Sequence, residues 1–131
     1  MRPKHLILAA LITGGLVAPA QATGGLSCTA EGVSLNLTLG RTVIASVAGA
    51  YLTIGEESWS TAPDVVKGTP IVVGQAFSDE KQLLVDFTDD IVNEIVARLR
   101  LSIADGGETQ VIGGTLEMPG RGAWVVACEE S

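Results

Sequence analysis

Carboxylates are the side chains through which this sequence could do chemistry, and they occur in two groups. Asp86, Asp89 and Asp90 lie close together, and Glu56 and Glu57 are adjacent. Two carboxyl groups that flank a cleft can hydrolyse a glycosidic bond, and several carboxylate and carbonyl oxygens from loops can bind Ca²⁺. However, the sequence has few aromatic side chains to line a sugar cleft, and the aspartates lack the spacing of the twelve-residue calcium loop. We expect the acids to keep the protein soluble, with calcium binding by a loop as the alternative.

Chemistry that depends on histidine is excluded once the N-terminal segment is set aside. The one histidine, His5, lies within residues 1–22, and no Gly-x-Ser-x-Gly motif occurs. A zinc site would lack imidazole ligands and would need both cysteines as free thiolates. We therefore expect no catalytic residue, no metal and no cofactor, and the sequence predicts that the protein is not an enzyme.

Three further residues are candidate contacts for a partner. Arg98 and Arg100 are two residues apart, so they share one face of a strand. They could bind an acidic group of a partner, or form cross-strand ion pairs with acids such as Asp86, each worth less than about 1 kcal/mol when exposed. Trp59 follows an acidic turn and precedes the longest expected loop, 60–68. An aromatic residue at a loop edge is a favoured contact, but a tryptophan in a small barrel more often lies in the core.

The N-terminal segment, residues 1–22, has the parts of a cleaved secretory signal. Arg2 and Lys4 are basic, about a dozen apolar residues follow, and Ala20 and Ala22 supply the small side chains before the cleavage site. Cleavage would leave a single β domain, residues 23–131, with six basic side chains, all fifteen acids and a net charge of −9. We expect a periplasmic or secreted protein that does not insert into a membrane, and so acidic a surface is a poor partner for nucleic acid.

Two cysteines lie near the two ends of the cleaved chain, Cys28 and Cys128. Paired thiols in an oxidising compartment usually form disulfides, and one pairing within the chain exists. The bridge needs Cα atoms within about 7 Å of each other, so the first and last strands should be neighbours. Closing a loop of about 100 residues would add roughly 4–5 kcal/mol of stability on the chain-entropy model.

Alternation of apolar and polar residues predicts the fold class. Val33, Leu35 and Leu37 alternate with Ser34, Asn36 and Thr38, which is the pattern of a half-buried strand. The same alternation favours a strand over 95–103, with at most one short helical turn near 89–94 before it. Further expected strands are 42–47, 50–54, 69–77, 81–88, 109–118 and 123–128, separated by turn residues. The sequence therefore predicts an all-β fold, a small antiparallel sandwich or closed barrel of about seven or eight short strands.

Two short stretches also carry a spaced set of small and aromatic residues. Cys28 is followed by Gly32-Val33-Ser34-Leu35, and Ser46 and Tyr51 precede Trp59-Ser60. These stretches resemble the opening cysteine and first strand, and the Ser-Gly-x-x-Tyr loop and downstream tryptophan, of the periplasmic inhibitors of C-type lysozymes. In this chain the serine and the glycine are not adjacent. The resemblance implies an exported eight-stranded antiparallel barrel in which Ser46 and Tyr51 would face the enzyme.

Together these observations predict an exported, disulfide-stabilised domain with a non-catalytic binding or structural role in the cell envelope. The alternative is a protein inhibitor of a cationic secreted hydrolase such as a C-type lysozyme, because opposite charge speeds the encounter of an acidic inhibitor with a basic enzyme. In both cases the expected partner is a protein.

Overall fold

Nine strands account for most of the residues that the computed structural model describes, which are 23–41 and 45–131. The expected signal, residues 1–22, lies outside the described residues. In chain order the strands are β1 (Thr23–Ala30), β2 (Val33–Arg41), β3 (Ala45–Ile54), β4 (Glu57–Ser60), β5 (Thr69–Ser78), β6 (Gln82–Asp89), β7 (Ile95–Asp105), β8 (Gln110–Met118) and β9 (Gly122–Glu130).

The strands form a closed barrel in which each is hydrogen-bonded to the next and β9 returns to β1. A ring of nine strands cannot be antiparallel throughout, because an odd number of alternating directions leaves one pair parallel. That pair is β4–β5, where Trp59 lies opposite Thr69 and Ser60 opposite Pro70. The other neighbouring pairs are antiparallel. The predicted all-β class is therefore confirmed as a closed barrel, with nine strands instead of seven or eight.

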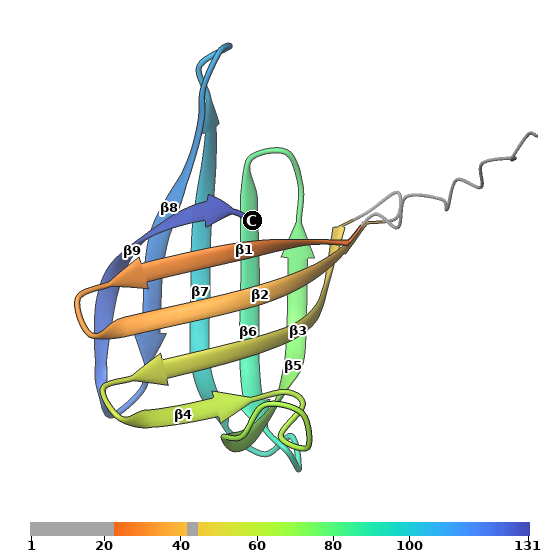
Figure 1. The fold of residues 1–131 in the computed structure, drawn as a ribbon, viewed down its shortest axis with the longest axis vertical. Helices are drawn as coiled ribbons and strands as arrows, with labels where there is room; N and C mark the ends of the chain where they lie inside the picture. The colour runs from red at the N-terminus through yellow and green to blue at the C-terminus, as the bar shows by residue number, and fades with distance from the viewer. Residues whose placement is uncertain (1–22, 42–44) are drawn as a thin grey trace, which may run out of the picture.

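Figure 1 shows how the ring is folded in space. Strands β1–β4 cross in front of β5–β8, and β9 curves from one layer to the other. We call the end that carries the β5–β6 turn and the β7–β8 hairpin the upper end, as drawn. The β6–β7 and β8–β9 turns lie at the opposite, lower end.

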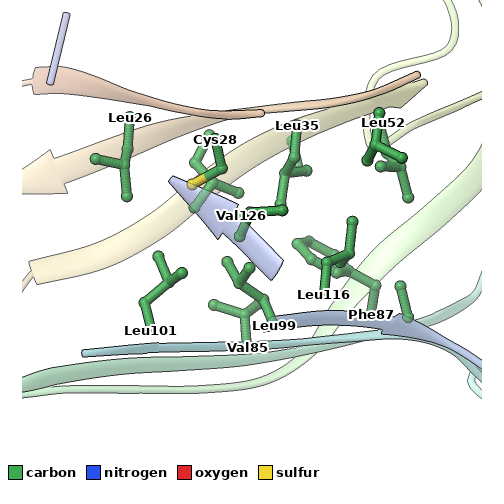
Figure 2. Packing of buried hydrophobic residues seen from close by; sticks show 14 of the residues in the cluster. Leu26, Cys28, Leu35, Leu52, Val85, Phe87, Leu99, Leu101, Leu116 and Val126 are labelled. Carbon is green, nitrogen blue, oxygen red and sulfur yellow. The ribbon is translucent and has the colours of Figure 1, made fainter. Parts of the chain in front are cut away.

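Side chains at alternate strand positions fill the barrel. On β2, Val33, Leu35 and Leu37 are buried, whereas Asn36 and Thr38 are exposed. Figure 2 shows apolar side chains from opposite walls pointing toward one another, among them Leu26, Leu35, Leu52, Val85, Phe87, Leu99, Leu101, Leu116 and Val126. Burial of this apolar surface is the main favourable term in folding, so parity along each strand decides which residues remain outside for function.

The predicted disulfide joins Cys28 of β1 to Cys128 of β9. The two residues lie directly opposite each other in the β1–β9 pairing, with Cα atoms 4.0 Å apart, and both are buried. The bridge therefore ties together the two strands whose pairing closes the ring. The expectation that the first and last strands are neighbours is confirmed.

The segment 89–94, for which at most one short helical turn was expected, contains no helix. This segment is the tight turn that joins β6 to β7. The backbone N–H of Val92 donates to the Asp89 carbonyl oxygen at 3.0 Å, and the Asp89 carboxylate accepts the Asn93 N–H at 2.6 Å. A tight turn between two paired strands, held by the Asp89 side chain, satisfies these backbone groups without a helix.

Two expected strands prove to belong to one. Strand β3 includes the described part of 42–47 and all of 50–54, and residues 42–44 lie outside the described residues. The pairing of β3 with β2 shifts register between Thr38 and Leu39. This β-bulge lies beside Gly49, where the alternation of apolar and polar residues in the sequence breaks.

Candidate functional site

A pocket of about 270 Å³ opens at the upper end of the barrel, and we call it the upper mouth. Its floor is the last layer of the core, made of apolar side chains from five strands. These are Leu26, Leu39, Leu83, Ile103 and Ile112. Leu26 and Leu83 are buried and the other three are half-buried. They have the inward parity of core residues, but they lie where the strands end, so the pocket exposes part of this layer.

The rim of the upper mouth is acidic and polar. Its carboxylates are Asp79, Glu80 and Glu130, and its uncharged polar side chains are Ser46, Ser78 and Gln110. Among the described side chains that line this pocket there is no lysine or arginine. The arrangement therefore places negative charge around an apolar floor.

The turn that carries two of these acids has a fixed shape. The Asp79 carboxylate accepts the backbone N–H of Lys81 at 2.8 Å and that of Gln82 at 2.9 Å, and the Asp79 N–H donates to the Gln82 carbonyl oxygen at 3.0 Å. Asp79 is thus used to hold the turn, which is a common role for this residue type. Glu80, at the tip of the same turn, is exposed.

A second hollow of about 520 Å³ adjoins the upper mouth, between the β5–β6 turn and the β7–β8 hairpin. Glu80, Ile103 and Gln110 line both, and Lys81 and Asp105 complete the second. The Ile103 N–H donates to the Lys81 carbonyl oxygen at 2.8 Å, which fixes the hairpin against the turn. Because the hairpin rises above the rest of the barrel (Figure 1), a partner at the upper end would meet both hollows together.

Arg98 and Arg100 lie on the outer face of β7, as their parity predicts, and both are in cross-strand ion pairs. Arg100 Nη1 is 2.9 Å from Asp86 Oδ1, and Arg98 Nη1 is 3.3 Å from Glu117 Oε1. The Asp86 oxygen is buried without an aligned hydrogen-bond donor, because Arg100 Nη1 donates instead to the Leu99 carbonyl oxygen at 2.9 Å. The structural alternative for the two arginines is confirmed, whereas a contact with a partner stays a prediction.

Trp59 is not the exposed residue that a loop-edge contact requires. It is 7% exposed and belongs to the core. The Arg121 guanidinium lies over its ring, 5.3 Å from the centroid, and makes a two-pronged hydrogen bond to the Glu57 carboxylate, with Nη2 2.7 Å from Oε2. Of the two interpretations of this tryptophan, the place in the core is confirmed, because β4 turns the side chain inward beneath Arg121.

The two residues that the lysozyme-inhibitor resemblance implied are not brought to one site. Ser46 lies at the rim of the upper mouth. Tyr51 lies further along β3, in a separate hollow beside the 61–68 loop. Of the two, only Ser46 shares a pocket with the acidic rim.

The clustered aspartates are separated by the strand that carries them. Asp86 and Asp89 are three positions apart on β6, so their side chains leave opposite faces of the strand. Within residues 23–41 and 45–131, no three His, Cys, Asp or Glu side chains gather so that they could hold a metal ion.

The upper mouth was not predicted from the sequence, because it is formed by strand ends that are distant in the sequence. One signal was available. The alternation of β7 runs to Ile103, and Asp105 follows two residues later, so an inward apolar residue lies close to an acid where the barrel must end.

Comparison with known protein families, with curated proteins and with solved structures finds no significant match to this chain. In the part of the chain that the structure describes, no helix has the length and apolar character needed to cross a membrane.

Proposed function

We propose that this protein is an exported, non-catalytic binding protein of the cell envelope whose upper mouth holds a basic segment of another protein. The observation that carries the proposal is the apolar floor of the pocket beside the carboxylates of the β5–β6 turn, Asp79 and Glu80. A segment that combines a cationic side chain with an apolar one fits this arrangement, since the apolar group is buried on the floor while the cation stays beside the acids.

The size of the pocket supports a protein segment in preference to a large free ligand. Sites for drug-sized molecules usually measure about 300–1,000 Å³ and bury most of the ligand. At about 270 Å³ the upper mouth lies just below this range, which suits one or two side chains of a larger partner.

The charge of the whole chain supports a basic partner. The net charge is −7, and the upper end adds Asp105 and Glu108 on the β7–β8 hairpin to the acids of the rim. Opposite charge accelerates encounter and makes it dependent on salt, because the Debye length is about 10 Å at 0.1 M ionic strength.

Inhibition of a cationic secreted hydrolase is the second candidate, and the position of Ser46 favours it. This residue is one of those that the resemblance to the lysozyme inhibitors singles out, and it lies at the acidic rim. An enzyme held at this rim would lose activity if its active-site cleft were the surface in contact.

The test is a calorimetric titration of the purified protein, oxidised and without residues 1–22, with a C-type lysozyme and with a short Lys/Leu peptide. We expect binding that weakens with salt and that Glu80→Gln weakens severalfold. Glu56→Gln removes the same charge at the lower end and should have little effect. Unchanged binding in Glu80→Gln, or equal losses in the two variants, would refute the upper mouth as the site.

Lytic activity measured in the same mixtures separates the two candidates. Loss of lysis at stoichiometric amounts of the protein identifies an inhibitor, whereas binding with full lysis identifies a binding module. Full lysis together with no binding to either probe contradicts both.

Export is tested by locating the protein in its host cells and determining its N-terminal residue. Residues 1–22 and the Cys28–Cys128 bridge support it, because such disulfides persist in oxidising compartments. We expect the protein recovered from its host to be extracytoplasmic and to begin at Thr23. A cytoplasmic protein that retains Met1 would contradict this part of the proposal.

A further inference from the structure

A hollow of about 330 Å³ lies over the outer face of β5, β6 and β7, which are neighbours in the barrel (Figure 1). Three of its side chains form one row across these strands, because Phe77 pairs with Leu84 and Leu84 pairs with Arg100. Phe77 is 52% exposed, and Leu84 is half-buried. The hollow therefore places an apolar surface directly beside a guanidinium group.

The contacts that hold the Arg100 guanidinium all go to one of its nitrogens. Nη1 is 2.9 Å from Asp86 Oδ1, and it donates to the carbonyl oxygens of Leu99 at 2.9 Å and of Val85 at 3.4 Å. Within the described part of the chain, no group accepts a hydrogen bond from Nε or Nη2. The guanidinium is thus fixed through Nη1, and its Nε–Nη2 edge is left for a ligand.

The chemistry of that edge selects a carboxylate. Two parallel N–H groups of an arginine match the two oxygens of a carboxylate, and such two-pronged pairs are among the stronger hydrogen bonds in proteins. The neighbouring acids do not oppose this. Asp86 is balanced by Arg100, and Glu117 is 3.3 Å from Arg98 in the next pair on the same face. These four side chains have no net charge, although the whole chain has −7.

The row of side chains sets the length of the ligand. Neighbouring strands lie about 4.8 Å apart, so about 10 Å separate the positions of Arg100 and Phe77 across β6. A molecule that binds the arginine with its carboxylate can lay its carbon body over Leu84 and reach the Phe77 ring. That body must be apolar, because covering an aliphatic and an aromatic side chain is favourable against an apolar group.

We propose that this hollow binds the carboxylate of a molecule whose apolar body extends about 10 Å from it. Arg100 binds the carboxylate through Nε and Nη2, Asp86 holds the guanidinium in place, and the body contacts Leu84 and Phe77. Two sources have this chemistry. One is a free aliphatic or aromatic acid, and the other is the C-terminal residue of a peptide chain.

The hollow is distinct from the upper mouth. Among the described residues, none lines both. The ligand also carries the opposite charge from the basic segment expected at the mouth. The inference therefore goes beyond the proposed function, and each of the two proposals can fail while the other holds.

Amide NMR titration of the oxidised protein without residues 1–22 tests the site. The probes are octanoate, 3-phenylpropionate and the peptide Gly-Gly-Gly-Phe with a free C-terminus. We expect saturable shift changes at Phe77, Leu84 and Arg100, with a Kd on the order of 1 mM for so small a ligand. The neutral 3-phenylpropionamide and the amidated peptide should bind at least about tenfold more weakly, since they lack the charged acceptor.

The two sources are separated in the same titrations. Tighter binding of the peptide identifies a protein C-terminus as the ligand, whereas tighter binding of octanoate or 3-phenylpropionate identifies a free acid. Either result supports the site. No saturable shift with any of the three acids, or equal binding of the acids and their amides, overturns the inference.

Two pairs of variants test the residues. Arg100→Lys keeps the positive charge beside Asp86 but loses the fork, so it should weaken binding severalfold. Arg98→Lys makes the same change on the same face outside the hollow and should have little effect. Phe77→Ala should also weaken binding, and Val125→Ala, which removes an apolar side chain that is 79% exposed on β9, should not. Equal effects within either pair would contradict the assignment.

Discussion

Arg121 has two roles at the lower end of the barrel that no local pattern in the sequence indicates. Its guanidinium covers the ring of Trp59 and at the same time binds the Glu57 carboxylate. Residues 57 and 121 are distant in the sequence, and they meet because the β8–β9 turn and the start of β4 lie at the same end. The guanidinium thus covers a core aromatic residue, and its hydrogen bonds to the adjacent carboxylate fix its position.

The Glu57 carboxyl reports on this contact. Hydrogen bonds from Arg121, helped by its charge, hold the pKa of Glu57 below its ordinary value of 4.5. A lowered pKa in the folded state means that the pair stabilises the fold above the ordinary value, and that this contribution is lost as the pH falls through the folded value. Arg121→Met should return the pKa of Glu57 to its ordinary range while the methionine still covers Trp59. NMR titration of the side-chain carboxyl carbon measures the change, and an unchanged pKa would contradict the pairing.

Single residues were predictable where strand parity decides their place. Arg98 and Arg100 lie outside and pair across strands because alternate positions of β7 face away from Leu99. The place of Trp59 was left open between core and contact, because its strand is too short to show alternation, and the Arg121 side chain that covers it is distant in the sequence.

At the scale of the strands, Gly114 determines how closely β7 and β8 approach. A Cβ at this position would meet the Arg100 carbonyl oxygen, and would lie 2.9 Å from both the Arg100 carbonyl carbon and the Leu101 Cα. These are backbone atoms of the neighbouring strand, so they cannot rotate away. The Gly113-Gly114 pair lies in an unbroken register between β7 and β9, and therefore serves close packing and not a bulge.

Gly114→Ala should lower the free energy of unfolding by at least about 2 kcal/mol, because strands packed this tightly must separate to admit a methyl group. Gly106→Ala is the matched control. Its added Cβ would lie 3.5 Å from the nearest atom, the Thr109 carbonyl oxygen, so we expect a change within about 0.5 kcal/mol. Urea denaturation of both variants measures the difference. Equal stabilities would show that the two strands do not approach so closely.

The elements that the sequence predicted are those with long alternation. The alternation that begins at Val33 marks the start of β2, and the strand expected over 95–103 is β7, which extends two residues further. Strands β1 and β4 were not expected. In β1, Gly24 and Gly25 interrupt the alternation of apolar and polar residues, and β4 has only four residues. Their pairing partners, not their own sequence, make them strands.

At the scale of the molecule, the disulfide and the strand count depend on each other. The parallel β4–β5 pair allows β1 and β9 to be antiparallel, and this places Cys28 opposite Cys128. The positions of the two cysteines predicted that the first and last strands are neighbours. They could not predict the ninth strand, because β4 is too short to leave a signal in the sequence.

Reduction of the bridge should lower the free energy of unfolding by about 4–5 kcal/mol, since it frees a loop of 100 residues in the unfolded chain. Urea denaturation with and without a thiol reductant measures this loss. The double variant Cys28→Ala/Cys128→Ala should be destabilised similarly and should not respond to the reductant. Equal midpoints for the oxidised and the reduced protein would contradict a closing role for the bridge.

The central claim is that the acidic upper mouth is the surface by which this protein binds a basic partner. Amide NMR spectra recorded while the Lys/Leu peptide is added test it most directly, because each strand end reports separately. We expect the largest shift changes at Glu80, Leu83, Ile103 and Ile112, and their loss in high salt. Changes confined to the lower end around Trp59, or to the outer face around Arg98 and Arg100, would contradict the claim.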